Sequence, residues 1–140
     1  MTFVDMDHVI EERAGRTVAA IFAEDGEPHF RAIERSLVKE LSAKQGLVIG
    51  AGGGVVLNGD NIRDFTDSGL VVCLTAAPEV ILRRLSGDSS RPLLEGGEKV
   101  GKILKLLESR RTLYDAIPHK VDTSRLTPAE VAASIESLAG

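Results

Sequence analysis

The chain has 140 residues and a mass of 15.0 kDa, which is the size of one domain with a single hydrophobic core. Hydrophobic residues make up 43% and charged residues 27%, and the formal net charge is -4, which argues against a nucleic-acid-binding surface. Cys73 is the only cysteine, so an internal disulfide is excluded, and no apolar stretch reaches the roughly 20 residues needed to span a bilayer. We therefore expect a monomeric protein of the cytoplasm with no nucleic-acid or membrane partner.

The first third of the chain is predicted to be mostly helical. Residues 2–6 are expected to form a short strand, followed by a short helix over 7–14 that a glycine ends. Thr17 is a suitable N-cap for the apolar run 18–22. A longer helix is predicted over 27–44, where apolar residues recur on one face at helical spacing: Phe30, Ile33, Leu37 and Leu41.

An apolar strand predicted over 47–49 runs directly into a cluster of three glycines, Gly52, Gly53 and Gly54. Because glycine has no Cβ, a ligand can approach its backbone closely. Open α/β folds bind ligands at the carboxyl edge of their sheet, so this strand is expected to present bare backbone amides at a ligand site. The alternative is a turn with spare glycines. A helix over 61–66 and an apolar strand over 70–74 follow.

The second half of the chain continues the alternation. A helix is expected over 78–87, a polar mobile loop over 88–97, a helix over 100–114 and a short strand over 119–122. Residues 127–130 form a capping box with proline at the first helical position, which predicts a final helix. Four strands that alternate with helices predict an α/β fold with a mostly parallel sheet.

Charged residues near the ends of these elements are candidates for chemistry. Asp5 and Asp7 lie two residues apart on an extended segment, so their carboxylates could together hold Mg²⁺ through water or bind a hydroxyl. The alternative is a solvated strand end at which Asp7 caps the next helix. Arg31 is suited to a two-point contact with a carboxylate, or it is a surface residue paired with Glu34 or Glu27.

Further arginines follow. Arg91 lies in the predicted loop, from which it could swing over a closed site and neutralise a transferred phosphoryl group, or it is a solvated charge. Arg110 and Arg111 could instead interact with the C-terminal dipole of their helix. Residues 96–103 nearly match the phosphate loop Gly-x-x-x-x-Gly-Lys-Ser/Thr, but Ile103 replaces the hydroxyl and no strand precedes them. We therefore do not expect a nucleotide loop there.

In order and spacing, these pieces resemble shikimate kinase over nearly the whole chain. No single stretch is specific, but the ordered set is: Phe3-Val4-Asp5-Met6-Asp7, Gly26-Glu27 with Phe30-Arg31-Ala32-Ile33-Glu34, Gly52-Gly53-Gly54, Arg91-Pro92-Leu93-Leu94, Arg110 before Leu113-Tyr114, and Val121-Asp122-Thr123. The resemblance implies one P-loop NTPase-like domain, with a parallel sheet in α/β/α layers as in nucleoside monophosphate kinases. It also implies transfer of the γ-phosphoryl of ATP to the 3-hydroxyl of shikimate, in aromatic amino-acid biosynthesis.

The resemblance implies a role for each substrate-side residue. Asp7 would bind the shikimate hydroxyls and accept the proton of the attacking one, and Asp5 would help to hold Mg²⁺ through water. Arg31 and Arg110 would clamp the shikimate carboxylate. Gly53, with its neighbours, would contact the ring hydroxyls. A small anion with several hydroxyls needs such a cationic clamp with carboxylate and backbone partners.

The resemblance also implies contacts to ATP. Arg91 would descend onto the phosphates from a lid over about 88–98, and Arg84 would lie near the nucleotide. Pro128 would border the adenine. Some relatives carry an arginine where Leu126 stands, so this chain departs from their pattern beside the adenine.

The signature phosphate loop of the family does not occur among the 140 residues. In relatives it precedes the Asp-x-Asp strand and follows the central strand of a five-stranded sheet of order 2-3-1-4-5. Either Met1 is an internal methionine of a longer enzyme, which we favour, or the chain is a true short protein. The lysine and amides of that loop hold the β- and γ-phosphates, so we expect the 140 residues alone to be inactive as a kinase.

Two alternative functions are weighed against shikimate kinase. One is a related small-molecule kinase of the same fold, such as a gluconate kinase, which comparing the two substrates would distinguish. The other is a non-catalytic domain that binds shikimate without ATP, and it predicts binding that is lost on Arg31→Ala.

Overall fold

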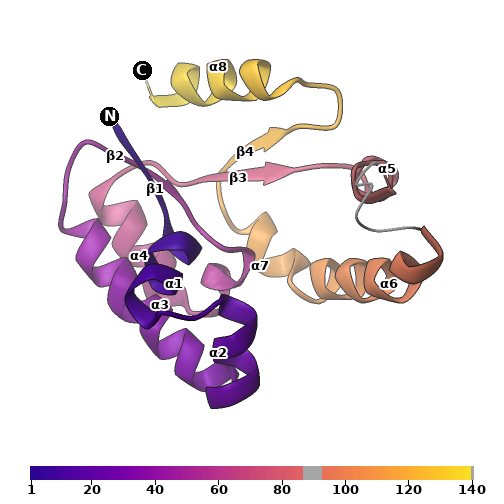
Figure 1. The fold of residues 1–140 in the computed structure, drawn as a ribbon. Helices are drawn as coiled ribbons and strands as arrows, with labels where there is room; N and C mark the ends of the chain where they lie inside the picture. The colour runs from indigo at the N-terminus through magenta and orange to yellow at the C-terminus, as the bar shows by residue number, and fades with distance from the viewer. Residues whose placement is uncertain (87–92, 140) are drawn as a thin grey trace. The chain divides into compact units, whose positions relative to one another are not determined.

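The computed structural model of the chain describes the backbone of residues 1–86 and 93–139 (Figure 1). The chain divides into two compact units, Met1–Leu70 and Val71–Gly140. We refer to them as the N-terminal unit and the C-terminal unit and describe each by itself. None of the described helices has the length and apolar content that crossing a bilayer requires.

The N-terminal unit pairs two parallel strands and packs helices beside them (Figure 1). In register, Thr2 lies opposite Leu47 and Asp5 lies opposite Gly50, so the two strands end together. The residues that follow both strands therefore begin at one edge. The elements are β1 (Thr2–Asp5), α1 (Met6–Ala14), α2 (Val18–Asp25), α3 (Glu27–Ser42), β2 (Leu47–Gly50), the 3₁₀ helix η1 (Gly53–Leu57) and α4 (Gly59–Ser68).

Local signals in the sequence set most helix ends of this unit. The side chain of Asp5 caps α1 by accepting hydrogen bonds from the backbone N–H groups of Asp7 and His8, so the alternative in which Asp7 caps this helix is wrong. Gly15 ends α1 with a φ of 66°, a left-handed conformation that favours glycine. Thr17 caps α2, as predicted, by accepting from the N–H of Ala20 at 3.1 Å.

The core of the N-terminal unit forms where α1, α2 and α3 meet. Three of the four predicted core residues of α3 are buried, but Ile33 is only half-buried, and Val38, which was not predicted, is 0% exposed. The buried apolar side chains of these three helices are Met6, Ile10, Ile21, Phe30, Leu37, Val38 and Leu41. They hold α3 in place, and α3 carries Arg31.

The C-terminal unit also contains a parallel strand pair, with Val72 opposite His119 (Figure 1). The predicted capping box at Thr127 and Glu130 is confirmed, since each side chain accepts a hydrogen bond from the backbone N–H of the other residue, at 2.9 and 3.2 Å. The elements are β3 (Val72–Thr75), α5 (Pro78–Ser86), α6 (Leu93–Ser109), α7 (Arg111–Asp115), β4 (His119–Asp122) and α8 (Pro128–Ala139).

Four strands occur in the described residues, where β1 pairs with β2 and β3 pairs with β4. The order 2-3-1-4-5 contains the same two pairs if β1 to β4 are its strands 2 to 5. Two other predictions need correction. The loop predicted over 88–97 is wrong for residues 93–97, which belong to α6, and the rest of it lies outside the described residues. The helix predicted over 100–114 is two helices that meet at Arg110.

Candidate substrate site in the N-terminal unit

The glycine cluster, Asp7 and Arg31 converge at the carboxyl edge of the β1–β2 pair. A Cβ added at Gly52 would lie 3.4 Å from Oδ1 of Asp7. A Cβ added at Gly54 would lie only 2.6 Å from Cζ of Arg31, so a side chain there would collide with the guanidinium. The backbone of this glycine-rich segment therefore lies against both charged groups.

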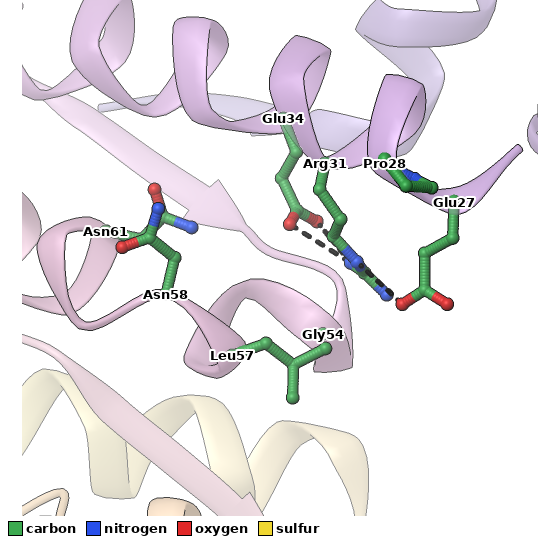
Figure 2. A pocket seen from close by; sticks show the side chains of 8 residues that line it. All are labelled: Glu27, Pro28, Arg31, Glu34, Gly54, Leu57, Asn58 and Asn61. Carbon is green, nitrogen blue, oxygen red and sulfur yellow. Dashed lines mark hydrogen bonds and ion pairs between the residues drawn. The ribbon is translucent and has the colours of Figure 1, made fainter.

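Four neighbouring side chains hold Arg31. Its Nη1 donates to both oxygens of Glu34, at 3.0 and 3.2 Å, and its Nε donates to Glu27 at 3.3 Å (Figure 2). Its Cζ lies 5.9 and 5.2 Å from the ring centroids of Phe22 and Phe30, within cation–π range. The alternative of pairing with Glu34 or Glu27 holds for both glutamates, but the side chain of Arg31 is half-buried, at 25% exposed, and is not that of a surface residue.

A cavity of about 390 Å³ lies beside Arg31 (Figure 2). Helix α3, the turn η1 and the start of α4 supply its walls, and the guanidinium points across it toward Gly54 (Figure 2). The lining residues are Glu27, Pro28, Arg31, Glu34, Gly54, Leu57, Asn58 and Asn61. This volume falls in the range of small-molecule sites.

The environment of Asp7 makes its carboxylate more basic. Burial is the largest cause that raises its pKa, and the negative charges of Asp5 and Glu11 raise it further. The positive charge of Arg31 opposes this shift. A carboxylate with a raised pKa accepts a proton more readily, so Asp7 suits the role of general base.

Asp5 and Asp7 also fit the kind of Mg²⁺ site that relies on one or two carboxylates and on substrate phosphates. The negative charge of Asp5 acts on Asp7 strongly enough to shift its pKa. In the described part of the chain, no group of three or more metal-binding side chains occurs. A magnesium ion here would therefore take most of its ligands from water and phosphate.

The remaining predicted residues belong to the second half of the chain. Arg84 donates to the hydroxyl and the carbonyl oxygen of Thr123, at 3.1 and 2.7 Å, which ties α5 to the end of β4. Arg110 is half-buried at the start of α7, and Pro128 is exposed at the start of α8. Arg91 lies outside the described residues. The near match to a phosphate loop at 96–103 lies inside α6, which confirms that it is no such loop.

One buried polar residue was missed. Asn61 is 1% exposed, donates to the carbonyl oxygen of Val55 at 3.1 Å and accepts from Arg35 at 3.1 Å. Arg35 is in turn paired with Asp64 at 2.8 Å. This network fastens η1 to α3 and α4. Only the position of Asn61 in the first turn of a helix was visible in the sequence, and that position is usually solvated.

Comparison with known proteins shows what the chain is similar to. The family model described as shikimate kinase matches residues 1–139. The chain is 46% identical over 125 residues to the shikimate kinase of Pelotomaculum thermopropionicum. The aligned residues cover 89% of this chain and 73% of that protein. It is 41% identical over 133 residues to the shikimate kinase of Thermodesulfovibrio yellowstonii, covering 95% and 77% of the two chains.

Solved structures give the same result. A shikimate kinase from Acinetobacter baumannii, determined in complex with shikimate, superimposes with a TM-score of 0.84 at 33% identity and covers 98% of this chain and 77% of that one. A shikimate kinase from Bacteroides thetaiotaomicron gives a TM-score of 0.83 at 32% identity. These matches confirm the predicted P-loop NTPase-like α/β fold and do not favour the gluconate-kinase or the non-catalytic alternative. The chain belongs to the shikimate kinase family.

Proposed function

We propose that this protein transfers the γ-phosphoryl group of ATP to the 3-hydroxyl of shikimate. The observation that carries the proposal is the convergence of Asp7, the glycine backbone and a firmly held Arg31 at one edge of the N-terminal unit. An anion with several hydroxyls requires these three kinds of group in one place. The reaction gives shikimate 3-phosphate and ADP.

The substrate-side residues divide the work by their chemistry. The guanidinium of Arg31 binds the shikimate carboxylate, with Arg110 as the second cation in keeping with the family resemblance. The backbone of Gly52, Gly53 and Gly54 lies against the ring hydroxyls, since a ligand can approach the backbone of glycine closely. Asp7 receives the proton of the 3-hydroxyl. The oxygen of that hydroxyl forms a bond to the γ-phosphorus of ATP while the bond between the γ-phosphorus and ADP breaks.

The nucleotide-side roles rest on the resemblance. Asp5 helps to hold Mg²⁺ through water, and the ion neutralises charge on the phosphates when it is bound. Arg91 belongs to a lid over about 88–98, while Arg84 and Pro128 border the nucleotide. We further propose that the chain acts as a cytoplasmic monomer and that its two units are parts of one shikimate-kinase-like domain.

The test compares the 140 residues alone with a chimera in which the segment preceding the matching region of the Pelotomaculum kinase is joined to Met1. The 140 residues contain no Gly-x-x-x-x-Gly-Lys-Ser/Thr, so we expect them to form no shikimate 3-phosphate. The chimera is expected to form it.

Activity of the chimera should fall by about a hundredfold or more in Asp7→Asn, the general-base variant. Arg13→Ala is the control, because Arg13 pairs with Glu40 through two hydrogen bonds at 2.7 and 3.0 Å and takes no part in the site. A folded chimera that phosphorylates gluconate and not shikimate would contradict the proposal, and so would one whose activity survives Asp7→Asn.

A further inference from the structure

Arg31 shares its single positive charge between two carboxylates of very different burial. The side chain of Glu34 is 3% exposed and contacts Nη1 with both oxygens. The side chain of Glu27 is 54% exposed and contacts Nε with one oxygen at 3.3 Å, the longest of the three bonds. Both residues line the cavity beside Arg31 (Figure 2). The two ion pairs therefore differ in how easily they can open.

The charges on this side of the unit do not favour an anion. Glu27 and Glu34 together carry two negative charges against the one positive charge of Arg31, and Asp7 is close enough to feel that arginine electrostatically. A guanidinium has five N–H donors in a fixed fork. Nε already donates to Glu27, so a ligand carboxylate that makes its two-point contact through Nε and Nη2 must replace that bond.

We propose that Glu27 is a built-in competitor for the substrate carboxylate on Arg31, and that shikimate displaces it on binding. This inference rests on the proposed function, because it assumes that Arg31 binds the carboxylate of shikimate. Glu27 lies at the start of α3, exposed and free to rotate into water. Glu34 is less able to move away, because its side chain is 3% exposed and cannot turn its charge into water as Glu27 can.

The consequence is that Glu27 lowers affinity for an anionic ligand. Loss of its charge should tighten shikimate binding, in contrast to the loss of affinity expected when an ordinary contact residue is changed. An exposed ion pair contributes little, so the gain should be about two- to fivefold. A purely structural role for Glu27 would give no gain at all.

The experiment is titration calorimetry of shikimate into the chimera described above, its Glu27→Gln variant and its Glu40→Gln variant. Gln keeps an oxygen that can accept from Nε of Arg31 but removes the charge. Glu40 is a matched control, because it lies on the same helix, pairs with Arg13 and stands about 20 Å from Glu27 along the helix axis. That distance exceeds the Debye length of about 10 Å in 0.1 M salt.

A second arm repeats the titrations with the methyl ester of shikimate, which has no negative charge. We expect Glu27→Gln to bind shikimate about two- to fivefold more tightly, Glu40→Gln to bind it as the unchanged chain does, and the gain to vanish with the ester. Equal or weaker shikimate binding by a folded Glu27→Gln chain would overturn the inference, as would an equal gain with the ester. If the unchanged chimera binds no shikimate, the proposed function itself fails.

Discussion

Gly54→Ala tests how tightly the glycine backbone and Arg31 fit together. The added Cβ would lie 2.6 Å from Cζ of Arg31, whereas carbon atoms pack best at about 3.5 to 4.0 Å. The guanidinium would have to retreat by about 1 Å. Its hydrogen bonds to Glu34 are now 3.0 and 3.2 Å long, and a shift of that size directed away from Glu34 would take them beyond hydrogen-bonding range.

The size of the effect follows from the bonds that depend on this placement. A hydrogen bond to a charged group contributes about 1.5 to 3 kcal/mol, and a displaced Arg31 would lose one such bond to the substrate carboxylate. Every 1.4 kcal/mol is about tenfold in affinity, so shikimate binding should weaken by about one to two orders of magnitude. The buried Glu34 would also lose a partner, so the fold should lose about 1 to 3 kcal/mol of stability.

The assay is shikimate titration together with urea unfolding of the Gly54→Ala and Gly59→Ala chains. Gly59 is the control because a Cβ there would meet nothing within 4 Å. Its replacement should leave binding unchanged and should alter the free energy of unfolding by less than about 1 kcal/mol. If Gly54→Ala bound shikimate as tightly as Gly59→Ala, the guanidinium would not be seated on the glycine backbone as we describe.

Three further predictions concern the same unit. Asp5→Ala should lower stability by about 1 kcal/mol in urea unfolding while Asp5→Asn should not, because Asn also caps helices; equal losses would disprove the capping role. Asn61→Ala leaves the carbonyl of Val55 and a donor of Arg35 without their buried partner, so unfolding should become about 1 to 3 kcal/mol easier, and an unchanged urea midpoint would contradict this. Asp7→Asn should raise the thermal midpoint at pH 7. Folding raises the pKa of Asp7 above its ordinary value of 3.8, so at higher pH the ionised carboxylate destabilises the folded state. The gain should disappear below pH 3.8, where the carboxyl is protonated in both states, and a gain that persisted there would refute the assignment.

Local signals explain which parts of the fold could be predicted from the sequence. Gly15 and Thr17 end and begin helices through bonds to residues three or four positions away, and the capping box of α8 is equally local. The pairing of Arg31 with Glu27 and Glu34 follows from their i,i+4 and i,i+3 spacing on one helix. These features need no knowledge of the tertiary structure.

Features that depend on tertiary contacts could not be predicted. Asn61 is buried because η1, α3 and α4 pack together around it. The residues near it in the sequence give no sign of that packing. The collision between a side chain at Gly54 and the guanidinium of Arg31 joins positions 23 residues apart (54 minus 31). In the C-terminal unit, Gly96 and Gly97 favoured a loop, yet the helix continues through them, since about 1 kcal/mol per glycine is a cost that a long helix can absorb.

The restraint of Arg31 bears on both affinity and specificity. The guanidinium of Arg31 lies near the rings of Phe22 and Phe30 and donates hydrogen bonds to the buried Glu34. The backbone of Gly54 lies against it as well. An arginine fixed in this way loses little conformational freedom when it binds a carboxylate, whereas a free arginine side chain would give up about 2 kcal/mol. Because these four contacts are buried or half-buried and Glu27 is exposed, we expect that affinity can be tuned at Glu27 without disturbing the guanidinium. If Arg31 binds the substrate carboxylate as we propose, the geometry of that recognition and its strength are controlled by different residues.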